Sequence, residues 1–128
     1  MNTERLRVWF LNVGHFVDHF CMLIFATAVI TMAAEFDMSY GELLAVATPG
    51  FVLFGAAALG AGWLGDRWSR NHMMVVFFCG IGAAAILVGL ASSVTEIGIG
   101  LALLALFAAI YHPVGIAMLV QGAPRLGL

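Results

Sequence analysis

Four long stretches of this 128-residue sequence contain almost no charged side chain. They cover residues 8–32, 43–64, 73–91 and 97–120. A helix needs about 20 apolar residues to cross the hydrocarbon core of a bilayer, and each stretch is close to that length. In lipid only a helix or a closed barrel satisfies its own backbone, and these stretches lack the strict alternation of barrel strands. The sequence therefore predicts an all-α integral membrane protein with four transmembrane helices.

The composition excludes several other classes of protein. Only 9% of the residues are charged, whereas a typical soluble domain has about 25%. The formal net charge is −2, so a basic nucleic-acid-binding protein is excluded and no nucleic-acid partner is expected. Cys21 and Cys79 lie inside apolar stretches and show neither metal-ligand spacing nor a disulfide framework. We expect a lipid bilayer as the surroundings of the chain, and no cofactor.

The basic residues predict an orientation in the membrane. All of them are arginines that fall before the first stretch, between the second and third, or after the fourth: Arg5, Arg7, Arg67, Arg70 and Arg125. The other two connections contain acidic and hydroxyl residues but no arginine or lysine. By the positive-inside rule, the N-terminus and the connection between the second and third stretches are cytoplasmic. We therefore expect a multi-pass protein of the cytoplasmic (inner) membrane.

Small residues spaced four apart are frequent in the second and third stretches. Such pairs let helix backbones approach closely in lipid, and together they favour a packed bundle over isolated spans. The pairs are Ala56/Gly60, Ala58/Gly62, Gly80/Ala84 and Ala85/Gly89.

The connection between the second and third stretches carries the most specific motif, Gly-Trp-Leu-Gly-Asp-Arg-Trp-Ser-Arg-Asn over residues 62–71. An aspartate at a helix boundary accepts backbone N–H groups or pairs with arginine. The motif resembles the signature of the major facilitator superfamily, which occupies the same connection on the cytoplasmic side. Ser69 and Asn71 stand where that family usually has glycine and a basic residue. The matching residues are Gly62, Leu64, Gly65, Asp66, Arg67 and Arg70.

The resemblance implies a fold and a function. Members of the superfamily are transporters, not enzymes, and have twelve helices in two six-helix halves. Residues 1–128 would then be the N-terminal part of such a domain, covering four helices of the first half, and transport would need the missing C-terminal helices. In the family the motif packs against the other half and closes the cytoplasmic side, so Asp66, Arg67 and Arg70 are expected to form a cytoplasmic gate. The expected partner is a small-molecule substrate.

The first stretch carries a polar face. Asn12, His15, Asp18, His19 and Met22 fall within an arc of about 120° on a helix. An ionisable group at membrane depth costs about 2.5–3.5 kcal/mol on insertion scales and normally faces a cavity or a partner. This face therefore predicts a substrate or coupling cavity.

The fourth stretch contains Tyr111-His112-Pro113, where the proline is expected to kink the helix. Asp18 lies about 15 Å from the start of its stretch and His112 about 12 Å from the end of its own, so both reach similar depths from the same side. In the superfamily both helices line the central cavity. The segments His15-Phe16-Val17-Asp18 and His112-Pro113 resemble the fosmidomycin-resistance type of branch. Histidine titrates near pH 6.5, so a His/Asp pair is suited to proton coupling.

The same residues leave other functions open. His15, Asp18, His19, Met22 and His112 suit a transporter or binding site for Zn, Ni or Fe ions. The spacing of His15, Asp18 and His19 is similar to that of an inverted zinc-protease motif, with aspartate in place of glutamate. A four-helix membrane subunit that works in an assembly is a further alternative.

Overall fold

Six helices make up residues 3–122, the part of the chain that the computed structural model describes. They are α1 (Thr3–Glu35), α2 (Tyr40–Ala45), α3 (Thr48–Arg67), α4 (Arg70–Gly89), α5 (Val94–Ala108) and α6 (Tyr111–Gly122). They combine into four segments long and apolar enough to cross a membrane: Thr3–Glu35, Tyr40–Arg67, Arg70–Gly89 and Val94–Gly122. The predicted all-helical fold with four spans is confirmed. The helices extend beyond the predicted stretches, except that the third ends at Gly89 instead of residue 91.

The second span is interrupted, which its apolar character did not predict. Pro49 occupies the first turn of α3, and the backbone turns at Val46 and Ala47. The N–H groups of these two residues bond three residues back, to Leu43 and Leu44, at 3.2 and 3.1 Å. A proline lacks the N–H for the bond four residues back, and its ring clashes with that carbonyl. The short helix α2 therefore ends at Ala45, and Pro49 lies in the first turn of a separate helix, α3.

The fourth span is broken in the same way, near the predicted kink. Helix α5 ends at Ala108 and α6 begins at Tyr111, so the interruption lies just ahead of Pro113. The carbonyl four residues before the proline belongs to Ala109, which caps α5. The break separates His112 from α5 and places this histidine in the first turn of α6.

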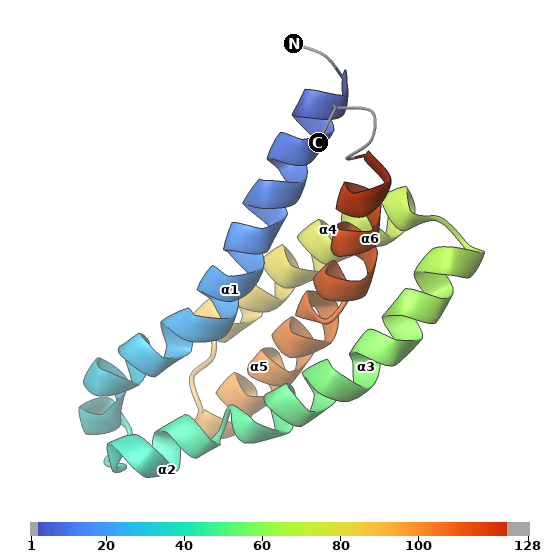
Figure 1. Cartoon of the computed structure of the whole chain (residues 1–128). Coiled ribbons are helices and arrows are strands. Elements are labelled where there is room, and N and C mark those ends of the chain that lie inside the picture. Colours follow the sequence, from blue (N-terminus) through green and yellow to red (C-terminus); the bar gives the residue numbers. More distant parts are fainter. Residues whose placement is uncertain (1–2, 123–128) are drawn as a thin grey trace.

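The fourth span forms the centre of the bundle. Helices α5 and α6 both contact α1, α3 and α4, and α4 pairs with α5 as an antiparallel hairpin (Figure 1). Half of the apolar window of this span, 50%, is buried inside the protein, against 11–33% for the other three. Figure 1 also shows that α1 begins, α3 ends, α4 begins and α6 ends at one end of the bundle. Four arginines share that end, and Arg125 lies outside the described residues.

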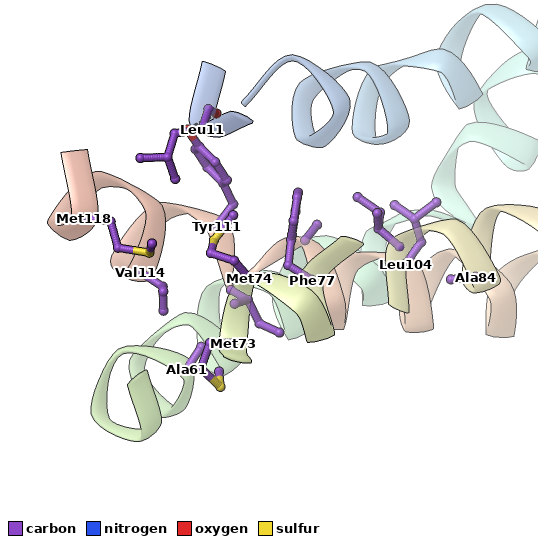
Figure 2. Close-up of a cluster of buried hydrophobic side chains, with 13 residues drawn as sticks. Leu11, Ala61, Met73, Met74, Phe77, Ala84, Leu104, Tyr111, Val114 and Met118 are labelled. Atoms are coloured by element: carbon purple, nitrogen blue, oxygen red, sulfur yellow. Dashed lines mark hydrogen bonds between the residues drawn. The ribbon is translucent and has the colours of Figure 1, made fainter. Parts of the chain in front are cut away.

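Glycines allow the closest approaches between helices. Gly80 of α4 lies flat against the ring of Phe107, and Gly100 of α5 lies against Val88. Gly60, in contrast, meets open space. Small-residue pairs therefore predicted a packed bundle, but not which of their members form the contacts. The surrounding core contains the buried residues Leu11, Ala61, Met73, Met74, Phe77, Ile81, Ala84, Leu104, Ala108, Ile110, Tyr111, Val114 and Met118 (Figure 2).

Serines close the N-termini of three helices. The side chains of Ser39, Ser69 and Ser93 each accept a backbone N–H from the first turn of the following helix. These bonds satisfy donors that would otherwise have no partner in the helix. Ser69, which departs from the superfamily signature, is thus the cap that starts α4.

Candidate functional site

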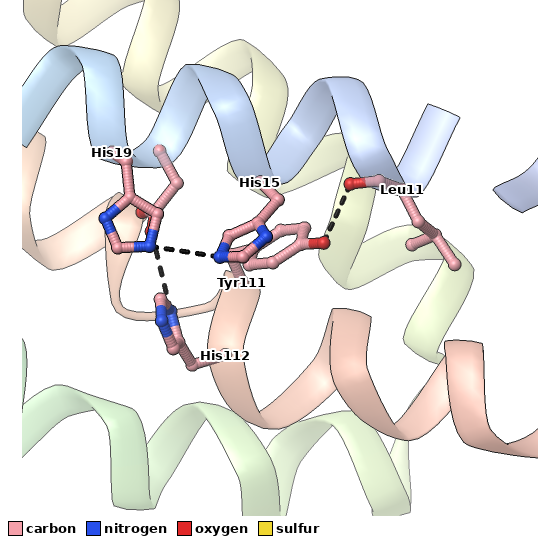
Figure 3. Close-up of polar contacts among 6 residues, drawn as sticks. Leu11, His15, His19, Tyr111 and His112 are labelled. Carbon is pink, nitrogen blue, oxygen red and sulfur yellow. Dashed lines mark hydrogen bonds and ion pairs between the residues drawn. The ribbon is translucent and has the colours of Figure 1, made fainter. Parts of the chain in front are cut away.

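A cluster of ionisable side chains lies where α1 meets the start of α6 (Figure 3). His15 and His19 come from successive turns of α1, and His112 comes from the first turn of α6. One ring nitrogen from each of the three histidines lies within 4.8 Å of the others. Nε2 of His15 and Nε2 of His19 are only 3.0 Å apart. Two helices of different spans therefore bring three imidazoles to one point.

Asp18 lies beside this cluster on the side that faces the bundle. Its side chain is 1% exposed, and its Oδ2 is 3.5 Å from Nδ1 of His112. Its other oxygen, Oδ1, has no hydrogen-bond partner within residues 3–122. The sequence predicted similar depths for Asp18 and His112, and the structure brings the two side chains together. The structure thus places a buried carboxylate against the only histidine that α6 contributes.

Tyr111 holds α1 and α6 together at this site. Its hydroxyl donates a buried hydrogen bond of 2.7 Å to the backbone oxygen of Leu11. The ring of His15 stacks on it, with 5.3 Å between centroids and 7° between planes. The tyrosine ring also fits against Gly14 and Gly115, where an added Cβ would come within 3.0 and 2.9 Å of it. Sequence reasoning assigned Tyr111 no role, because its partners Leu11 and Gly14 lie in a different span.

We expect Tyr111→Phe to lower the free energy of unfolding by about 0.5–1.5 kcal/mol, because it removes one buried hydrogen bond and keeps the ring. Thermal unfolding in detergent measures the change. Tyr40→Phe is the matched control, since the hydroxyl of Tyr40 makes a longer, exposed bond of 3.3 Å to Ala26. Equal losses in the two variants would contradict the role given to Tyr111.

The exposed side of α1 forms an open groove beside the histidines. Its volume is about 710 Å³, and its polar lining residues are Asn12, His15, His19 and Thr27. The side-chain amide of Asn12 bonds to Val8 of its own helix at 2.8 Å, and Met22 packs against the buried core. The predicted polar face is therefore divided. Asn12, His15 and His19 line the groove, whereas Asp18 and Met22 lie between helices.

The turn between α3 and α4 lies at the arginine-rich end of the bundle, away from the histidines. Asp66 Oδ1 pairs with Arg70 at 2.6 Å, and the guanidinium of Arg67 lies 4.7 Å above the ring of Trp63. Leu64 is 40% exposed. The motif residues thus form local pairs and leave part of the turn open to a partner.

Two glycines of the motif lie near the C-terminal end of α3 and face α6. An added Cβ at Gly62 would come within 3.2 Å of Pro113, and one at Gly65 within 2.9 Å of Val114. The absence of side chains lets α3 pack directly on the helix that carries His112. The C-terminal part of α3 therefore packs directly against the first turn of α6.

A sequence model of the Major Facilitator Superfamily matches residues 11–126, nearly the whole chain. The chain belongs to the major facilitator superfamily. It is accordingly a multi-pass membrane protein of the transporter kind, in agreement with its four membrane-spanning helices. Neither a curated protein nor a solved structure matches the chain. Members of the superfamily transport small molecules and are not enzymes, which places the cluster in a family whose cavities bind solutes.

Proposed function

We propose that this major facilitator chain forms part of a secondary active transporter that couples the movement of a small molecule to protons by alternating access. One observation carries the proposal. Asp18 is buried in the first membrane span and faces His112 of the fourth span at 3.5 Å. Ionisable groups at membrane depth are costly to maintain, and such groups mark ion and substrate pathways.

The pair provides a direct link between proton binding and helix position. With Asp18 charged, its attraction to a protonated His112 ties α1 to α6. A proton on the carboxylate removes that attraction and frees the two helices to separate. His15 and His19 stand in the open groove beside the pair, where they offer an entry route for protons and contacts for the solute.

Proton movement in proteoliposomes tests this proposal with any solute that the transporter carries. Vesicles that contain the complete transporter and a trapped pH-sensitive dye are mixed with a panel of small solutes. We expect a transported solute to change the internal pH, and a protonophore to abolish its accumulation. A solute that accumulates without any change in pH, and without sensitivity to the protonophore, would refute proton coupling.

We further propose that the N-terminus is cytoplasmic and that transport requires helices in addition to these four spans. Alternating access in this class uses a cavity between two repeats. The His-Phe-Val-Asp segment of α1 and the His112-Pro113 step support a place in the fosmidomycin-resistance type of branch. Two measurements on the N-terminally tagged product in its own membrane test these points. The mass of the product gives the length of the chain, and proteolysis of the tag from either side of the membrane gives the orientation of the N-terminus.

The turn between α3 and α4 is proposed to be the cytoplasmic gate. We expect Asp66→Ala to slow transport about two- to fivefold. The substitution removes an exposed ion pair worth about 0.2–1 kcal/mol. In the proposal this pair stabilises the state in which the cytoplasmic side is closed. The effect arises far from the substrate and is measured as turnover at saturating solute.

The partner variant provides the control for the gate. Arg70→Ala should slow transport to a similar extent, and the double variant should be no slower than either single one, because both remove the same pair. Unchanged turnover in Asp66→Ala, or additive effects in the double variant, would contradict the gate.

A further inference from the structure

We infer that His15, His19 and His112 form a binding site for a divalent first-row transition metal ion such as Zn²⁺. The sequence alone suggested a wider set of metal ligands, namely His15, Asp18, His19 and Met22, with His112 as a further candidate. The structure selects the three histidines from this set, because within residues 3–122 they are the group whose ligand atoms all lie within 4.8 Å of one another. The inference rests on this geometry, and the site shares His112 with the proposed coupling pair.

The spacing of the nitrogens matches a shared metal ion. Two nitrogens bound to a tetrahedral zinc ion at about 2.1 Å are about 3.4 Å apart. The Nε2 atoms of His15 and His19 are 3.0 Å apart, and the nitrogen of His112 is within 4.8 Å of both. The distance between the nitrogens of His15 and His19 has to grow by about 0.4 Å and those to His112 have to shrink by at most about 1.4 Å, which side-chain rotations can supply.

The scaffold restricts the rings to this arrangement. Histidines four residues apart lie on the same face of a helix, so α1 presents His15 and His19 as a pair. The ring of His15 is held by stacking on Tyr111. The ring of His112 packs edge-on against His15, His19 and Phe54, with centroids 5.6–5.9 Å apart. A site with rings already in place binds a metal ion at a lower entropic cost.

The charges near the histidines favour a cation. Three neutral imidazoles leave the charge of the ion uncompensated, and the buried carboxylate of Asp18 lies 3.5 Å from Nδ1 of His112. A carboxylate next to a ligating histidine orients the ring and makes it a stronger ligand. Imidazole ligands select zinc, copper or nickel over magnesium and calcium.

One side of the site borders the open groove along α1. His15 and His19 are exposed along this groove, so water or a solute donor atom can complete the shell. Three histidines with one open position form the type of site in which an exogenous ligand exchanges. The site therefore fits a metal ion, or a small metal-bound solute, as its occupant.

Cobalt absorption spectroscopy on the purified chain, without a polyhistidine tag, tests the site at one fixed pH. We expect saturable binding of one Co²⁺ ion with the intense visible bands of tetrahedral coordination, and displacement by Zn²⁺. His15→Gln, His19→Gln and His112→Gln should each weaken binding by about 100-fold or more, because loss of an outer-shell partner alone costs about 10–100-fold.

His72→Gln is the matched control, since His72 is the remaining histidine of the sequence and stacks on Trp68 in the turn before α4. It should bind Co²⁺ as tightly as the wild type. Copper EPR of the wild-type chain, with splitting from three nitrogens, supports the site without any variant. The inference is overturned if the wild type shows no saturable binding, if the three cluster variants bind normally, or if His72→Gln loses binding equally. None of these readouts involves transport, so they separate this inference from the proposed function.

Discussion

Asp18→Asn is expected to reduce proton-driven transport by about 100-fold or more. Groups that carry a proton in a working protein typically contribute about 10²–10⁴-fold to the rate. Asparagine keeps the shape of the side chain but cannot take up and release a proton. It also removes the charge that makes Asp18 costly at membrane depth, about 2.5–3.5 kcal/mol on insertion scales. The variant should therefore insert and fold while it fails to couple.

Asp37→Asn is the matched control for this experiment. Asp37 is exposed between α1 and α2 and has a left-handed backbone, with φ of 51°. Asparagine tolerates this conformation, so the variant loses a carboxylate outside the site without strain. It should accumulate solute as the wild type does under the same pH gradient. Normal proton-driven accumulation in Asp18→Asn, or an equal loss in Asp37→Asn, would refute the coupling role.

Gly80→Ala is expected to lower the free energy of unfolding by about 1–3 kcal/mol, the usual cost of overpacking a core. An added Cβ would overlap the ring of Phe107, which lies directly on the glycine. The overlap includes Cγ, the ring atom nearest the backbone, so rotation of the ring about its own axis does not relieve it. The hairpin of α4 and α5 must separate instead. Thermal unfolding in detergent measures the loss.

Gly82→Ala provides the comparison on the same helix. Gly82 is exposed, and an added Cβ meets no atom within 4 Å. Because alanine favours helix over glycine, this variant should be as stable as the wild type or more stable. Equal destabilisation by the two substitutions would show that α4 needs glycine for its backbone and not for the contact with Phe107.

The sequence by itself determined the class of fold. An apolar stretch that crosses a bilayer must satisfy its backbone hydrogen bonds within the protein, so four helical spans followed from local composition. The motif around Asp66 indicated the superfamily to which the chain belongs. The similar depths of Asp18 and His112 were also predictable, since helix rise alone sets them.

Tertiary structure decided which groups meet within that framework. Periodicity placed Asp18 on the same polar face as His15 and His19, but packing of α6 on α1 buries Asp18 and brings His112 to the other two histidines. Tyr111 gained its role in the same way, through a bond to a residue a hundred positions away. Such contacts depend on how whole helices cross, which is set by where glycines such as Gly14 allow close approach. A linear sequence specifies depth and face along one helix, whereas the neighbour across the interface emerges only when the helices pack.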